Sequence, residues 1–225
     1  MQADIDRLTS TSWDYATAFG PLMNHSLVGA VLNETLRLYS VIPVLAKTTL
    51  DTPQPIRLDG HTHTIAPNTV ILINTSAVHR NPAVWRSRPV NIAAGAPSAL
   101  GDFDPEQWLE RDAEGGTRVK TPVEGSYLAF SDGGRGCLGK VFGQAELCAF
   151  VARLFKDFTV ELKVDDLDVG DEAPLKREKW GKKRKEVERD MSANVEFYMS
   201  LRLATQIPVR FVRRGKETFA DLEEW

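Results

Sequence analysis

The chain has 225 residues, 42% of them hydrophobic, and a formal net charge of −3. This length allows one domain with a sizeable core, and the composition is ordinary for a soluble globular protein. The small negative charge gives no overall attraction to nucleic acid. The only cysteines, Cys137 and Cys148, are too few for a disulfide scaffold and favour a reducing compartment. No apolar run reaches the ~18 residues of a membrane span.

The first strong element is a helix within residues 24–40, which follows a helical or irregular lead-in over residues 1–23. Apolar side chains recur at i, i+3, i+4, i+7, i+8 and i+11, so they share one face of the helix. Ser40 and Pro43 mark its end. The stripe consists of Val28, Val31, Leu32, Thr35, Leu36 and Tyr39.

Short strands follow in a small β-sheet over residues 55–75. Asp59 and Gly60 separate two strand-like runs, which is the pattern of a hairpin with a tight turn. Residues 69–74 are rich in β-branched side chains and predict a buried strand. Residues 88–129 contain many Gly, Pro, Ala and charged residues without a clear period, so they predict a long irregular meander.

A second helix is predicted over residues 138–156. Its apolar face has spacings of four and three residues and consists of Val141, Ala145, Cys148, Ala152 and Phe155. Cys148 is read as a small core residue in preference to a redox thiol. Residues 164–190 are read as a charged insertion, and residues 191–214 as terminal strands.

The charged insertion contains a basic cluster at residues 176–185, predicted to lie in a loop. Such a cluster suits nuclear targeting, contact with an anionic membrane, or docking of an acidic reductase. A solvated loop is the favoured interpretation, because Glu186, Glu188 and Asp190 follow at once.

The most informative segment is residues 130–139, which has the pattern F-x-x-G-x-R-x-C-x-G. It places Cys137 in a glycine-rich loop before the predicted helix, with Arg135 two residues earlier. A helix N-terminus and a nearby cation both stabilise a thiolate. Glycines let the backbone approach a flat macrocycle, and an arginine can pair with a haem propionate. A cysteine hydrolase would need a base near Cys137, and no motif provides one.

This segment resembles the cysteine-ligand loop of the cytochrome P450 monooxygenases. The resemblance implies haem b as cofactor and Cys137 as the proximal ligand of its iron. It also implies that Phe130 packs beside the sulfur and that Arg135 holds a propionate. Gly133 would allow the tight turn, and Gly139 would permit close packing of haem against the helix.

A second motif, Glu34-x-x-Arg37, lies on the first predicted helix. Alone it is a weak signal, because an ordinary surface ion pair has the same spacing and stabilises by under ~1 kcal/mol. The order of this motif and of the segments that follow it agrees with the order in the family. The resemblance therefore implies that Glu34 and Arg37 form a structural pair. The H-R-x-P segment at residues 79–82 and the P-E-x-W segment at residues 105–108 follow it. Gln107 stands where the family has arginine, so Arg37 would carry the pair alone unless Arg88 or Arg111 reaches it.

The resemblance covers residues 27–158 and implies a mainly helical α+β fold with small β-sheets. We expect residues 1–225 to form one partial domain, the truncated C-terminal, proximal part of the family fold. No A-G-x-[DE]-T pattern is present, so no catalytic acid–alcohol pair is identified. The implied activity is insertion of oxygen into a lipophilic small molecule, with electrons from an NADPH-dependent reductase. A truncated form unable to complete catalysis is expected, and a non-catalytic haem-binding or interaction fragment is the alternative. The expected location is the cytoplasm or the cytosolic face of the endoplasmic reticulum.

Overall fold

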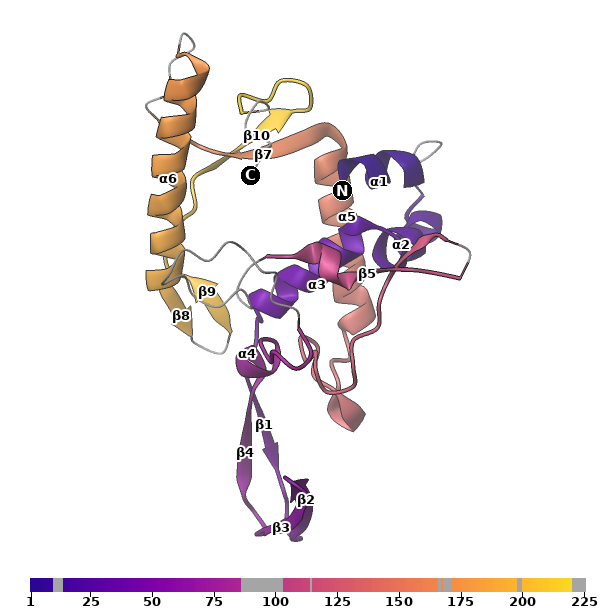
Figure 1. Cartoon of the computed structure of the whole chain (residues 1–225). Coiled ribbons are helices and arrows are strands. Elements are labelled where there is room, and N and C mark those ends of the chain that lie inside the picture. The colour runs from indigo at the N-terminus through magenta and orange to yellow at the C-terminus, as the bar shows by residue number, and fades with distance from the viewer. Residues whose placement is uncertain are drawn as a thin grey trace.

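A computed structural model describes residues 1–9, 14–85, 103–113, 115–165, 167, 171–197 and 200–219. These residues form helices and five two-stranded antiparallel sheets (Figure 1). The expectation of an α+β fold with small sheets is therefore confirmed. Within the described residues, no helix is both long and apolar enough to cross a bilayer.

The core is built by four helices: α1 (Gln2–Leu8), α2 (Tyr15–Asn24), α3 (Leu27–Leu38) and α5 (Lys140–Asp157). Side-chain oxygens cap two of them, because Asp14 accepts from Ala16 N and Ser26 accepts from Val28 N. A Cβ at Gly29 would overlap the Met23 carbonyl group, so only glycine allows α3 to approach α2 this closely. The contacts among the four helices bury Ile5, Leu22, Val28, Cys148 and Ala152.

Two hairpin-like pairs extend from the end of α3. Strand β1 (Val44–Thr48) pairs with β4 (Val70–Asn74), and β2 (Gln54–Leu58) pairs with β3 (His61–Ile65). The predicted tight turn is present between β2 and β3, where Asp59 and Gly60 both have positive φ angles, of 50° and 81°. These angles suit a two-residue hairpin turn.

The expectation of a buried strand at residues 69–74 is wrong. Val70 and Leu72 in β4 are 65% and 66% exposed. Among the described residues this sheet has two strands, and β1 and β4 extend away from the helices (Figure 1). A run of β-branched residues indicates a strand, but burial depends on whether another layer covers the sheet.

Part of the predicted meander has regular structure. Helix α4 (Thr75–Val78) precedes it, and a 3-10 turn, η2 (Pro105–Trp108), is followed by the antiparallel strands β5 (Leu109–Arg111) and β6 (Thr117–Val119). The strands are three residues long, too short to show a period. Residues 88–102 of the meander lie outside the described residues.

The C-terminal region contains β7 (Phe158–Leu162) paired with β10 (Val209–Arg213), and β8 (Val195–Phe197) paired with β9 (Leu201–Leu203). The expectation of a charged loop across residues 176–185 is wrong, because they lie in the 21-residue helix α6 (Ala173–Ala193). Lysine, arginine and glutamate favour helix without creating an apolar period. Ion pairs one turn apart, such as Arg184–Glu188 at 2.7 Å, add support.

Candidate functional site

The cysteine loop is a closed turn between β6 and α5. Phe130 O accepts a hydrogen bond from Cys137 N at 2.8 Å. Ser131 and Gly133 turn the chain with positive φ angles of 59° and 72°, and the Asp132 carboxylate accepts from Gly133 N at 2.7 Å. The 3-10 turn η3 (Gly133–Arg135) then leads to Cys137, just before α5 begins. The backbone therefore holds the cysteine at the start of a helix.

Cys137 is exposed and lines a hollow of about 710 Å³. Two cationic side chains, Arg135 from the same loop and Lys47 from β1, line this hollow as well. Its other walls are mostly apolar and come from the two segments that meet here. The remaining lining residues are Ile42, Leu45, Ala46, Thr48, Leu50, Ala129, Phe130 and Ser131.

Gly139 and Gly143 lie beside the sulfur and the Phe130 ring, at ordinary contact distances. A Cβ at Gly139 would lie 4.0 Å from Cys137 Sγ, and one at Gly143 would lie 3.8 Å from Phe130 Cε1. A thiol donor, two cations and apolar walls fit a flat iron macrocycle that carries carboxylates. The hollow thus has the donor set that haem requires.

The apolar face of helix α5 is exposed at its first turn and buried farther along the helix. Val141 at its first turn is 68% exposed, whereas Cys148 and Ala152 are fully buried. Burial raises the pKa of the Cys148 thiol to about 11, so it stays protonated at neutral pH. The structure agrees with Cys148 as a core residue.

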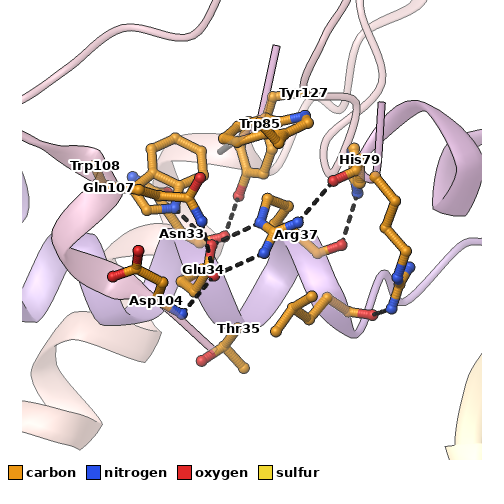
Figure 2. Close-up of polar contacts among 12 residues, drawn as sticks. Asn33, Glu34, Thr35, Arg37, His79, Trp85, Asp104, Gln107, Trp108 and Tyr127 are labelled. Atoms are coloured by element: carbon orange, nitrogen blue, oxygen red, sulfur yellow. Dashed lines mark hydrogen bonds and ion pairs between the residues drawn. The ribbon is translucent and has the colours of Figure 1, made fainter. Parts of the chain in front are cut away.

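A second group of polar residues is buried around Glu34 on α3 (Figure 2). Arg37 donates to both Glu34 oxygens, from Nε at 2.7 Å and from Nη2 at 2.8 Å. The two side chains are 0% and 1% exposed, so this is not an ordinary surface ion pair. The Arg37 guanidinium also lies 5.3 Å from the ring centre of Trp85.

Three further donors reach Glu34 from the segment around η2. They are Asp104 N at 2.9 Å, Gln107 Nε2 at 3.0 Å and Trp108 Nε1 at 2.9 Å. Burial favours the neutral acid, but these bonds and the Arg37 charge hold the pKa of Glu34 below its ordinary value. Arg111 is exposed and donates to Gly115 O instead, and Arg88 lies outside the described residues.

Gln107 therefore keeps a bond to Glu34 in the position where the family has arginine. Its Oε1 is buried without a hydrogen-bond partner among the described residues. An unsatisfied acceptor of this kind costs about 1–3 kcal/mol. The carboxylate itself is fully paired, because the Trp108 indole supplies a bond that sequence reasoning did not foresee.

His79 connects this cluster to the cysteine loop. Its Nδ1 lies 3.0 Å from Arg37 O, and its Nε2 accepts from Leu128 N at 2.8 Å. The acceptor role of Nε2 requires a neutral ring with the proton on Nδ1. Burial, reinforced by the charges of Arg37 and Arg80, lowers the pKa of His79 to about 4. Leu128 precedes Phe130 by two residues, so His79 positions the start of the loop.

The buried face of α3 differs from the predicted stripe in its second half. Val28 and Leu32 are buried as expected, but Tyr39 is 51% exposed while Glu34 and Arg37 are buried. Tyr127 also joins the buried side and packs edge-on against Trp108 at 5.0 Å. The P-E-x-W segment marks Trp108 but not its bond to Glu34, 74 residues away, and nothing in the sequence marks Tyr127, whose partner lies 94 residues away.

The sequence of this chain is similar to those of known proteins. The family model for cytochrome P450 matches residues 16–179. Cytochrome P450 2J3 of Rattus norvegicus is 27% identical over 168 residues, which cover 74% of this chain and 28% of the relative. Probable cytochrome P450 6a21 of Drosophila melanogaster is 34% identical over 131 residues, or 57% of this chain and 21% of the relative.

The fold is similar to solved structures as well. The haem domain of cytochrome P450DA superposes with a TM-score of 0.59 at 20% identity, over 95% of this chain and 36% of that one. The structure of a zebra fish cytochrome P450 with abiraterone gives a TM-score of 0.58 at 22% identity, over 95% of this chain and 39% of that one. The chain thus spans about a fifth to two fifths of the length of these relatives.

Proposed function

Because this chain belongs to the cytochrome P450 family, we propose that its cysteine loop binds haem iron through the Cys137 thiolate. The observation that carries this proposal is the exposed cysteine beside two cations in a hollow whose other walls are mostly apolar. Haem iron with a thiolate ligand supplies the oxygen-activating chemistry of the family. The proposed cofactor is haem b.

Each loop residue has a proposed task. Arg135 pairs with a propionate, with Lys47 as a second cation on the same hollow. Phe130 packs beside the sulfur and shields it from water. Gly133 supplies the positive φ angle that the turn requires, and Gly139, which lies beside Sγ, permits close packing of haem against α5.

Glu34 and Arg37 are proposed as the structural pair that supports this loop. Arg37 Nη1 donates to His79 O at 2.8 Å, and the His79 ring accepts from Leu128 N. These contacts connect α3 to the segment that enters the cysteine loop. The pair therefore acts through position and does not contact the hollow.

The proposed reaction is insertion of oxygen into a lipophilic small molecule, with electrons from an NADPH-dependent reductase. Ile42 and Leu45 give the hollow an apolar wall, which favours a lipophilic substrate. The sequence contains no A-G-x-[DE]-T motif, so these residues supply no acid–alcohol pair for proton delivery. We therefore expect no turnover from this chain alone.

A non-catalytic haem-binding fragment is the second candidate. It is favoured by the one-sided lining of the hollow, because its lining residues, among those that the structure describes, come from segments 42–50 and 129–137. Iron bound there would remain open to water on the other side, where side reactions are not excluded.

The test is an absorption spectrum of the chain with haem, reduced under carbon monoxide. We expect the strongly red-shifted Soret band of a thiolate–carbonyl complex, and its loss in Cys137→Ala. Cys148→Ala is the matched control and should keep the band, because Cys148 is buried in the helical core.

An identical spectrum for the wild type and Cys137→Ala would overturn haem ligation by this cysteine. Turnover is then measured after addition of NADPH, a reductase and a lipophilic probe substrate, and any product would exclude the non-catalytic fragment. Product formation by the 225-residue chain would contradict our expectation of no turnover.

A further inference from the structure

Helix α1 lies beside α5 (Figure 1) and depends on other elements for its stability. It has seven residues, and among the described residues no side chain caps its first turn. Isolated helices of this length are not stable in water. Ile5 is its fully buried side chain and belongs to the apolar cluster that contains Cys148 and Ala152. Contacts with neighbouring elements must therefore keep α1 in place.

Two side chains connect α1 to the end of α5 and to β7 by hydrogen bonds. Lys156 Nζ in the last turn of α5 donates to Thr9 O at 2.9 Å and to Thr9 Oγ1 at 3.0 Å. Gln2 Nε2 donates to Phe158 O at 3.3 Å and to Thr159 Oγ1 at 3.2 Å. These bonds are only partly buried, and each contributes modestly to the stability of α1.

Arg214, which follows β10, contacts both α1 and the end of α5. Its Nη1 and Nη2 donate to the Asp6 carboxylate at 2.8 and 2.9 Å. Nη1 also donates to Lys156 O at 3.1 Å, and the backbone N donates to Asp157 O at 3.1 Å. A cation suits this place because the last carbonyls of a helix have no partner within it. The Arg214 and Asp6 side chains are 32% and 48% exposed, and an ion pair this exposed stabilises weakly.

The segment that carries Arg214 is held more firmly than the ion pair itself. We define the strap as residues 214–219. The backbone N–H groups of Thr218 and Phe219 donate to Glu161 Oε1 at 2.7 and 3.1 Å. Arg210 donates to Glu161 Oε2 from Nε at 3.0 Å and from Nη2 at 2.8 Å. Glu161 and Phe219 are buried, and the charge-assisted bonds of a buried carboxylate are costly to lose. The strap therefore stays in place when the exposed pair opens.

We propose that α1 is a releasable lid on α5, held shut by Arg214 on a strap that Glu161 anchors. The lid opens when the Asp6–Arg214 pair and the bonds at Gln2 and Thr9 break, while β7, β10 and the strap keep their structure. Opening uncovers the part of the apolar cluster that Ile5 covers. Haem takes no part in this motion, so the lid stands or falls separately from the proposed function.

Hydrogen exchange of the full chain, followed by mass spectrometry, tests whether α1 opens by itself. The amides of Ile5 and Thr9 donate to Met1 O and Ile5 O, so they exchange when the lid opens. A peptide from α3 reports unfolding of the core. We expect α1 to exchange faster than α3, at a rate that low urea hardly changes, because local opening exposes little surface. Equal rates with the same urea dependence would overturn the proposal.

Arg214→Gln removes the cation that holds the lid. An exposed pair contributes a factor of about five at most, so we expect α1 to exchange about three- to fivefold faster, with α3 unchanged. The matched control is Arg184→Gln, which removes the same charge from an exposed pair with Glu188 at 2.7 Å on α6. It should change neither helix. Equal acceleration of α1 in the two variants would overturn the role of Arg214.

Asp6→Asn removes the other half of the pair. We expect the same acceleration of α1, and the double variant with Arg214→Gln should exchange no faster than either single variant, because both substitutions remove one contact. Additive effects would mean that the two side chains act separately, which contradicts a lid held by their pairing.

Glu161→Gln keeps the size of the side chain but removes the charge that anchors the strap. We expect faster exchange at the amides of Thr218 and Phe219 together with faster exchange in α1, because a loosened strap no longer positions Arg214. Faster exchange in the strap with α1 unchanged would overturn the connection between anchor and lid. The Arg214 and Asp6 variants decide the proposal whether or not Glu161→Gln folds.

Discussion

Glu34 and Cys137 occupy two regions with opposite physical character. Glu34 is fully buried and accepts hydrogen bonds from five donors. Cys137 is exposed on a loop that backbone hydrogen bonds hold in place. We therefore expect substitutions around Glu34 to act on stability, and substitutions at Cys137 to act on cofactor binding. Four predictions test this separation.

The largest effect is expected for Glu34→Ala. It leaves the Arg37 charge buried without its partner, which costs about 3–5 kcal/mol of unfolding free energy. Urea unfolding measures the loss. Replacing both residues by leucine removes the unpaired charge and should recover part of the stability, so an equal loss in the single and double variants would contradict this explanation.

Trp108→Phe keeps most of the aromatic packing but removes the indole donor to Glu34. Loss of a hydrogen bond to a charged group should cost about 1.5–3 kcal/mol. The control is Trp180→Phe on α6, far from Glu34 in sequence, which should change unfolding by less than about 0.5 kcal/mol. Similar losses in the two variants would show that the indole bond is not important.

The third prediction concerns pH. The pKa of His79 is about 4 in the folded chain against 6.5 as its ordinary value, so the unfolded chain binds more protons between these values. Stability from this residue is complete above pH 6.5 and is lost as pH falls toward 4, by about 2 kcal/mol between pH 7 and pH 5.

Urea unfolding at several pH values measures this slope. His79→Gln, which does not titrate, should flatten it between pH 6.5 and 5. An unchanged slope would assign the pH dependence to other groups.

The smallest effect on stability is expected for Cys137→Ala without haem. An exposed side chain contributes little to folding, so the unfolding free energy should change by less than about 0.5 kcal/mol. Haem binding, measured by titration, should nevertheless be lost. A large destabilisation would mean that the two regions are not separable in the way we infer.

Local patterns predicted much of the fold. Apolar spacing located α3 and α5, and the Asp59-Gly60 pair located the turn between β2 and β3. Patterning did not locate α6, because that helix consists mainly of charged residues and has no apolar stripe of useful length. Burial of β4 was predicted wrongly, since no second layer covers it within the part of the chain that the structure describes.

The sequence by itself determined the cysteine loop, because five specified positions fall within residues 130–139 and their spacing is local. Only the tertiary structure decided which groups donate hydrogen bonds to the buried Glu34 carboxylate. Its donors from Gln107 and Trp108 lie 73 and 74 residues away, and Tyr39 is exposed where the helical period predicted burial. Local order sets which residues share a turn or a helix face, whereas the packing of distant segments decides which face is buried.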